Sequence, residues 1–157
     1  MQKRITLSVP VYLQKFLVGE FIGEYSEKGA CLHVEKRSEI GKLIHLVSRY
    51  YPFPVAVPKP AGTTITISYY CREKSYEFPA DKYGELTRQL DEIFRRSMIC
   101  EVRRVHELAG GDYGVHIRQF LNRYQIEADV DVDFETIRKI YRDYLHRISQ
   151  KNRKILA

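Results

Sequence analysis

A long helical pattern in the middle of the chain most constrains what this sequence can fold into. From Asp81 to about Leu108, apolar residues recur every three or four positions and no proline interrupts them. Gly110 and Gly111 follow and are expected to end the helix. At about 1.5 Å per residue, the predicted helix is roughly 40 Å long. Its apolar positions are Leu86, Leu90, Ile93, Phe94, Met98, Val102 and Val105.

Strand patterns occur only in the first half of the chain. Alternation of apolar and polar residues predicts a strand over residues 4–9. Residues 63–71 are rich in β-branched and aromatic side chains, and residues 75–78 follow a predicted tight turn. We therefore expect a hairpin of 63–71 with 75–78. Because an isolated hairpin is marginally stable, residues 4–9 are expected to join it in a small antiparallel sheet.

Two further helices are predicted before the hairpin and two after the long helix. The first pair covers 11–22 and 38–50, with Ser38 as N-cap, and the second covers 115–124 and the segment after Asp133. The expected fold is α+β: a small antiparallel sheet packed with helices, then a helical C-terminal half. The predicted organisation, which one domain can also accommodate, is an N-terminal strand and helix unit at 1–51, a Pro-rich connection at 52–62, the hairpin with the long helix at 63–109, and a basic helical unit at 110–157.

The cysteines and the N-terminus bear on the expected location. Cys31, Cys71 and Cys100 are odd in number, and their spacing matches no disulfide framework or zinc site. No segment reads as a signal peptide or approaches the roughly 20 apolar residues of a membrane span. We therefore expect reduced thiols, a cytoplasmic protein and no membrane partner.

The net charge of the chain is concentrated at its C-terminal end. Residues 138–157 contain seven Lys and Arg and one acidic residue, whereas residues 1–137 contain 19 basic and 19 acidic residues. The pattern predicts a helix with a frayed tail. One side of it is apolar and the other carries the cations, as expected of an element that packs with one face and meets polyanions with the other. The apolar side holds Ile137, Tyr141, Tyr144 and Ile148, and the basic side holds Arg138, Lys139, Arg142 and His146.

Two segments near the C-terminus, VHIRQFLNRY at 115–124 and FETIRKIYR at 134–142, resemble the helix-turn-helix superfamily of DNA-binding proteins. The resemblance implies DNA as partner, with Thr136, Arg138, Lys139 and Arg142 towards the groove. From the residues themselves, His146 extends the basic side and Lys151, Arg153 and Lys154 are expected to contact phosphates.

The connection between these two segments is about eight residues long, whereas the usual turn has three or four. It also contains four acidic residues, so DNA binding requires that they point away from the basic side. These residues are Glu127, Asp129, Asp131 and Asp133.

Other interpretations of the basic helix stay open. Most charged stripes are solvated helix faces, and a protein that binds only other proteins would also fit. If the basic side lies against acidic side chains of the chain, its charge is already neutralised. The leading hypothesis is a small DNA-binding accessory or regulatory protein, similar in size and charge to proteins of phages and mobile elements, with a possible homodimer through 81–108.

The remaining motifs do not support a catalytic or metal site. Asp129-x-Asp131-x-Asp133 resembles the start of a calcium loop, but Phe134 and Ile140 replace the required Gly and Glu. No zinc, nucleotide-loop or hydrolase signature is complete, so we expect neither a cofactor nor an enzyme. Tyr69 and Tyr70 are of the type that stacks RNA bases, but the favoured interpretation is core packing on one face and ordinary exposure on the other.

Overall fold

The computed structural model describes residues 1–156 and has the expected α+β fold, a small sheet with helices. The chain forms two compact units, Met1–Glu92 and Ile93–Ala157. The boundary between them lies inside the long helix α3 (Tyr83–Ala109), which therefore contributes residues to both units. The expected helix over 81–108 is confirmed, with a short 3-10 turn, η1 (Ala80–Lys82), directly before it.

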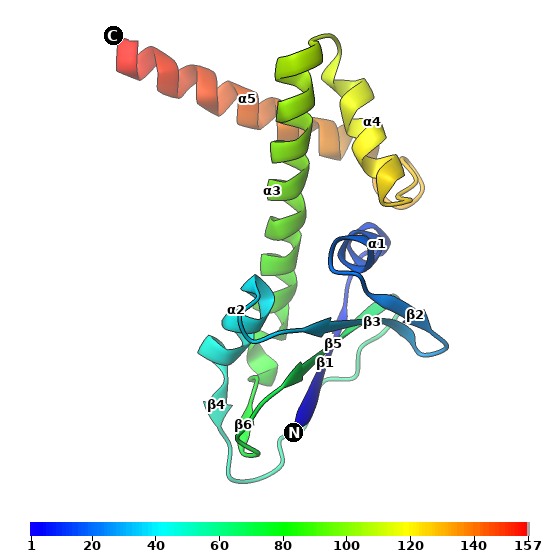
Figure 1. Cartoon of the computed structure of the whole chain (residues 1–157), viewed down its shortest axis with the longest axis vertical. Helices are drawn as coiled ribbons and strands as arrows, with labels where there is room; N and C mark the ends of the chain where they lie inside the picture. Colours follow the sequence, from blue (N-terminus) through cyan, green and yellow to red (C-terminus); the bar gives the residue numbers. More distant parts are fainter. Residues whose placement is uncertain (157) are drawn as a thin grey trace. The chain divides into compact units, whose positions relative to one another are not determined.

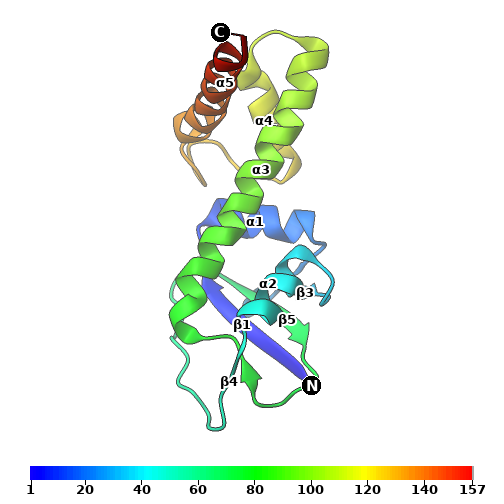
Figure 2. The ribbon, with the colours of Figure 1, turned by 90° about the vertical axis from the view of Figure 1, so that its left-hand side faces the viewer.

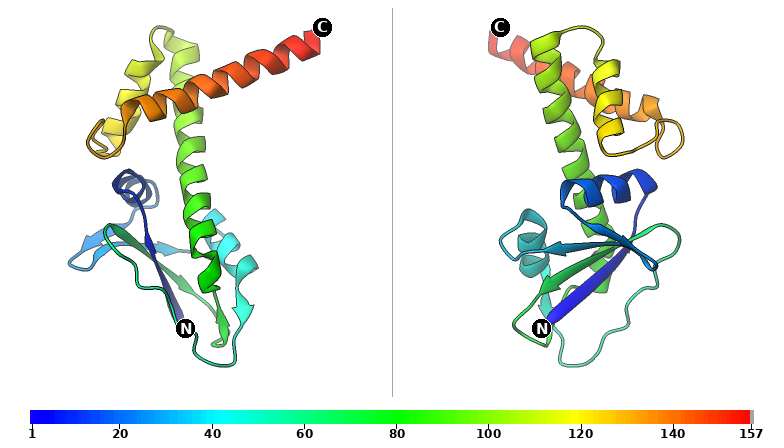
Figure 3. Two further views of the ribbon diagram at one scale, coloured as in Figure 1. Left: turned by 180° about the vertical axis from the view of Figure 1, so that it is seen from behind. Right: turned by 45° about the vertical axis from the view of Figure 1, so that its right-hand side comes forward.

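The main sheet of the first unit is mixed rather than antiparallel. It consists of β1 (Gln2–Ser8), β2 (Glu24–Ser26), β3 (Gly29–Val34) and β5 (Thr64–Tyr70), in the order β1-β5-β3-β2 (Figures 1 and 3). Strand β5 is antiparallel to β1, as expected, but parallel to β3. Consequently three strands from the first 51 residues and the strand at 64–70 belong to one sheet.

The expected hairpin of 63–71 with 75–78 is wrong. Strand β6 (Tyr76–Glu77) pairs instead with β4 (Arg49–Tyr50) in a separate two-stranded sheet. The physical reason is that β1 and β3 already occupy both edges of β5. The buried Lys3 ammonium also holds the return segment, because it donates to the carbonyl oxygens of Lys74 and Tyr76 and lies 3.0 Å from Glu77 Oε1.

Helices α1 (Val11–Glu20) and α2 (Glu39–Val47) complete the first unit. Ser38 is the N-cap of α2, as predicted, and its Oγ accepts a hydrogen bond from the amide of Gly41 at 3.0 Å. A Cβ at Gly41 would lie 1.9 Å from the carbonyl oxygen of Glu35, so the turn between β3 and α2 requires glycine. The Pro-rich residues 51–63, all of them described, contain no helix or strand.

The second unit is built from the last part of α3, α4 (Tyr113–Arg123) and α5 (Phe134–Leu156). Helix α5 crosses α3 where Tyr141 and Tyr144 meet His106 and Arg103, and its later residues extend past this crossing (Figures 1 and 2). The core of the unit is apolar and fully covered, and is formed by Phe94, Met98, Val102, Ile117, Phe120, Leu121, Phe134, Ile137 and Tyr141.

Candidate nucleic-acid interface

The start of α5 is fixed by acidic residues of the connection that precedes it. Asp129 Oδ1 accepts a hydrogen bond from the amide of Phe134 at 3.0 Å, and Asp133 Oδ2 accepts one from the hydroxyl of Thr136 at 2.9 Å. The Asp129 oxygen thus satisfies one of the backbone amides that the first helical turn leaves without a partner, and the Asp133 oxygen holds the side chain of Thr136. Asp129 has a φ of 63°, a left-handed conformation that Asp tolerates better than most residues.

The carboxylate of Asp131 is also used within the connection. Asp131 Oδ2 accepts a hydrogen bond from the amide of Glu127 at 2.8 Å, and an isolated bridge joins Ala128 to Val132. In the part of the chain that the structure describes, none of the four acids forms an ion pair with a Lys or Arg of α5. They therefore do not neutralise the basic side of the helix.

The apolar side of α5 packs against both other helices of the unit. The ring of Tyr141 is 5.1 Å from the ring of Tyr113, and its hydroxyl is 3.2 Å from His106 Nδ1. The guanidinium of Arg118, on α4, lies 3.9 Å above the centre of the Phe134 ring. Tyr144 and Ile148 are only half-buried, so burial decreases along the helix.

Two of the predicted site residues near the start of α5 are held by neighbouring side chains. The Thr136 hydroxyl is engaged with Asp133 as described above. The Arg138 guanidinium lies 3.6 Å from Glu135 Oε1 and 5.8 Å from the centre of the Tyr113 ring. A hydrogen bond with Tyr113 and the charge of Glu135 raise the pKa of Arg138. Arg138 thus keeps its charge but has a defined position.

The other predicted site residues are exposed. His146 is 3.1 Å from Gln150, nitrogen to nitrogen. Six cations of α5 form no hydrogen bond or ion pair within residues 1–156. They are Lys139, Arg142, Arg147, Lys151, Arg153 and Lys154.

The tail of α5 is helical and not frayed as expected, since the helix continues to Leu156. At about 100° per residue, this fixes where each cation lies around the helix axis. One side, which we call the first flank, carries Arg138, Arg142 and Arg153. The opposite side, the second flank, carries Arg147, Lys151 and Lys154. The strip between the flanks carries Lys139, His146 and Gln150.

Sequence reasoning missed the residues that position this helix from outside it. Neither Tyr113, whose ring lies 5.8 Å from the Arg138 guanidinium, nor Arg103, whose Nη1 donates to the Tyr144 hydroxyl at 2.7 Å, was among the predicted site residues. Both contacts join residues about 25 to 41 positions apart, so no local pattern indicates them. Arg147 was counted in the charge but not assigned to the site.

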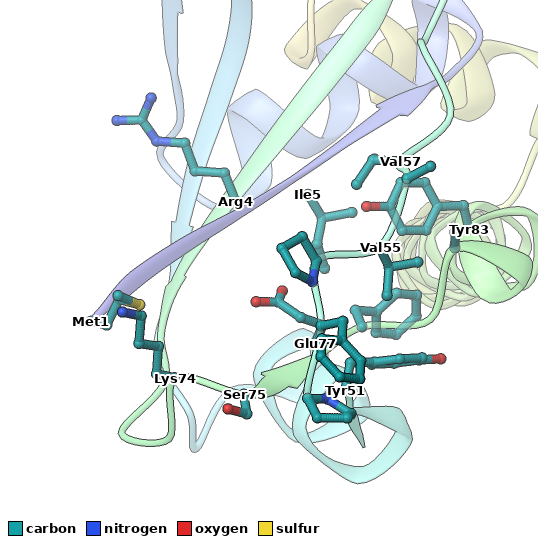
Figure 4. A pocket seen from close by; sticks show the side chains of 16 residues that line it. Met1, Arg4, Ile5, Tyr51, Val55, Val57, Lys74, Ser75, Glu77 and Tyr83 are labelled. Atoms are coloured by element: carbon teal, nitrogen blue, oxygen red, sulfur yellow. The ribbon is translucent and has the colours of Figure 1, made fainter.

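The first unit contains a hollow that is a second candidate site. It has a volume of about 510 Å³ and lies between the Pro-rich segment and strand β1. Figure 4 shows Val55 and Val57 of that segment near Glu77 and Tyr83. Glu77 is paired with Lys3 and much of the lining is apolar, so Arg4 and Lys74 are the cations of the lining without an ion pair in the described chain, fewer than the six of α5.

Two properties of residues 1–156 bear on the partners. No helix among them is both long and apolar enough to cross a membrane. No group of three or more His, Cys, Asp or Glu side chains in these residues has the arrangement of a metal site. Comparisons with protein-family models, curated proteins and solved structures found no match to this chain.

Proposed function

We propose that this protein binds duplex DNA through α5, as an accessory or regulatory protein. The observation that carries the proposal is the set of six exposed cations on α5 that have no partner in the described chain. Three of the four acids of the connection, Asp129, Asp131 and Asp133, accept hydrogen bonds at the start of α5 or within the connection. The open basic side is therefore available to a polyanion. Such a role places the protein in the cytoplasm, with its DNA partner.

The two flanks favour a helix that lies in the major groove. That groove is about 12 Å wide and an α-helix with side chains is about 10–12 Å across. A helix in it has a phosphate backbone on each side, which matches cations on two opposite flanks. The strip between them then faces the base edges, where Lys139 can donate to guanine acceptors. Arg138, fixed on Tyr113, sets the position of the helix relative to one backbone.

The test is a fluorescence-anisotropy titration with a labelled duplex of about two helical turns at about 50 and 200 mM salt. Each phosphate contact contributes about 0.9 to the slope of log affinity against log salt. Removing two cations of the first flank (Arg142→Ala with Arg153→Ala) or of the second flank (Arg147→Ala with Lys151→Ala) is expected to lower that slope by about two. A helix lying flat on one backbone would respond to one pair only.

A matched control distinguishes an effect of the α5 cations from an effect of positive charge anywhere on the protein. Lys28 and Lys59 are exposed residues of the first unit that form no ion pair in the described chain. The double variant Lys28→Ala with Lys59→Ala removes the same charge and is expected to leave the slope nearly unchanged. No binding at low salt, or equal loss in the control and in both flank variants, would rule out a dedicated α5 interface.

A protein partner is the alternative function, and one observation favours it. Ile155 and Leu156 at the end of α5 are 70% and 86% exposed. The expected homodimer through 81–108 has less support, because Leu86, Leu90, Phe94, Met98 and Val102 are already buried within the chain. Light scattering of the purified protein with and without Ile155→Asp tests self-association. A dimer that the variant disrupts would favour this alternative.

A further inference from the structure

A groove lies where the two parallel strands of the main sheet end. Strands β3 and β5 run side by side, with Val34 opposite Tyr69, and both end at this edge. The chain then turns from β3 towards α2 and from β5 towards β6, and the space between these paths is a groove of about 1240 Å³. Crevices at the carboxyl ends of parallel strands are common ligand sites in open sheets.

The groove combines aromatic surface with positive charge. Tyr70 is 62% exposed and Tyr76 is 38% exposed, so parts of both rings are accessible. The cations of the lining are Lys36, Lys42 and Arg72, and its carboxylates are Glu35 and Glu73. The positive side chains thus outnumber the negative ones by one, which is a weak attraction for a bare anion.

His45 forms part of the wall of the groove. Its Nε2 is buried and has no hydrogen-bond partner within residues 1–156, and its ring packs edge-on against the ring of Tyr69 at 5.7 Å between ring centres. Burial, together with the charge of Lys36, lowers the pKa of His45 and so favours the neutral ring. His45 therefore adds aromatic surface to the wall, and the charge of the groove comes from its Lys, Arg and Glu side chains.

We propose that this groove binds a phosphorylated nucleobase, as a free nucleotide or as part of a single strand. The base stacks on Tyr70, and the phosphate lies among Lys36, Lys42 and Arg72. Stacking on aromatic side chains accepts every base and adds the affinity that the small charge excess does not provide. The site is separate from α5, so it stands or falls independently of duplex binding.

The absence of tryptophan makes a direct test possible. The chain contains 12 Tyr and no Trp, so the substitution Tyr70→Trp introduces a single indole at the groove. Base stacking is expected to quench its emission saturably when adenosine monophosphate or a single-stranded oligoadenylate is added. Quenching by the mononucleotide identifies a free nucleotide as ligand, and quenching by the oligomer alone identifies a strand. Quenching by neither overturns the proposal.

Tyr25 provides the matched control, since it is 61% exposed on the edge strand β2 of the same unit. The indole of Tyr25→Trp is expected to show no saturable quenching, and equal quenching in both variants would also overturn the proposal. Pyrophosphate and an abasic oligomer are expected to leave the emission of Tyr70→Trp unchanged, because they offer no base. Quenching by either of them would contradict the stacking.

Binding to the groove without an introduced Trp can be measured in parallel with a fluorescein-labelled oligoadenylate. To weaken binding by α5 equally in every protein compared, all of them carry Arg142→Ala and Lys151→Ala. In this background Tyr70→Ala is expected to weaken binding at least about fivefold, whereas Tyr70→Phe retains most of it. Lys36→Ala with Lys42→Ala is expected to reduce the salt dependence. Unchanged affinity in Tyr70→Ala, with the fold intact by circular dichroism, would refute the site.

Discussion

Asp129 is expected to stabilise the protein by capping α5. Three substitutions separate the contributions of its hydrogen bond, its charge and its backbone conformation. Its carboxylate accepts the Phe134 amide at 3.0 Å, and its φ of 63° is in the left-handed region. Loss of such a cap costs about 1 kcal/mol, and a β-carbon without a compensating polar group in this conformation costs about 1 kcal/mol more. Asp129→Ala should therefore lower the free energy of unfolding by about 2 kcal/mol.

Asp129→Gly and Asp129→Asn each remove only part of the stabilisation that Asp129→Ala removes. Asp129→Gly keeps the conformation without strain and loses the cap, so about 1 kcal/mol is expected. Asp129→Asn keeps the hydrogen bond and loses only the favourable charge near the helix N-terminus, a cost of about 0.5 kcal/mol. Urea unfolding followed by circular dichroism gives the three values directly, provided that the slope with urea stays constant.

The expected order of destabilisation is Ala, then Gly, then Asn. If Asp129→Asn costs as much as Asp129→Ala, the charge and not the hydrogen bond is the stabilising part. If none of the three changes stability, the cap does not form in solution. Duplex affinity of Asp129→Asn should change less than about twofold, because the acid is engaged within the connection. A large gain would mean that Asp129 lies close to the bound DNA.

Three further predictions concern other contacts. Tyr141→Phe removes the hydroxyl 3.2 Å from His106 Nδ1 and should cost about 1 kcal/mol in urea unfolding. Gly41→Ala places a Cβ against the Glu35 carbonyl and should cost about 1–3 kcal/mol in the same assay, with weaker nucleotide binding in the groove. Since burial lowers the pKa of folded His45, the unfolded chain takes up the proton first. Stability should then fall as pH drops below about 6.5, and His45→Phe should reduce this fall in urea midpoints measured from pH 8 to 5.

Local patterns in the sequence were sufficient for the helices. The long helix was expected over 81–108 and covers Tyr83–Ala109, and the cap at Ser38 was identified from residue type alone. These features depend on residues at most a few positions apart. Strand pairing depends on residues far apart in the sequence, so the alternation in 63–71 predicts a strand but not its neighbours in the sheet. The parallel pairing of β5 with β3 was therefore not predicted, and β6 was assigned to the wrong strand.

The distinction between local patterns and contacts over long sequence distances applies also to the basic side of α5 and to the groove. Periodicity alone separated the buried Ile137 and Tyr141 from the exposed Lys139 and Arg142, and DNA contact by this face stays a prediction. The groove could not be found this way. Its lining comes from segments that meet only because β3 and β5 are parallel neighbours, and the exposure of Tyr70 therefore looked ordinary in the sequence.

The charge pattern of α5 is itself unfavourable for the free protein. Arg138 and Arg142, and likewise Arg147 and Lys151, are like charges four positions apart, and each such pair destabilises a helix by about 0.2–0.5 kcal/mol. Cations near the C-terminal end offset part of this through the helix dipole. A helix that only covered the core would be more stable with acids interspersed, yet Asp143 is the one acid after Glu135. Local choices that oppose stability are expected at functional sites. A polyanion that lies along both flanks would remove this repulsion on binding, which is why we assign the basic side of α5 to an interface rather than to solvation.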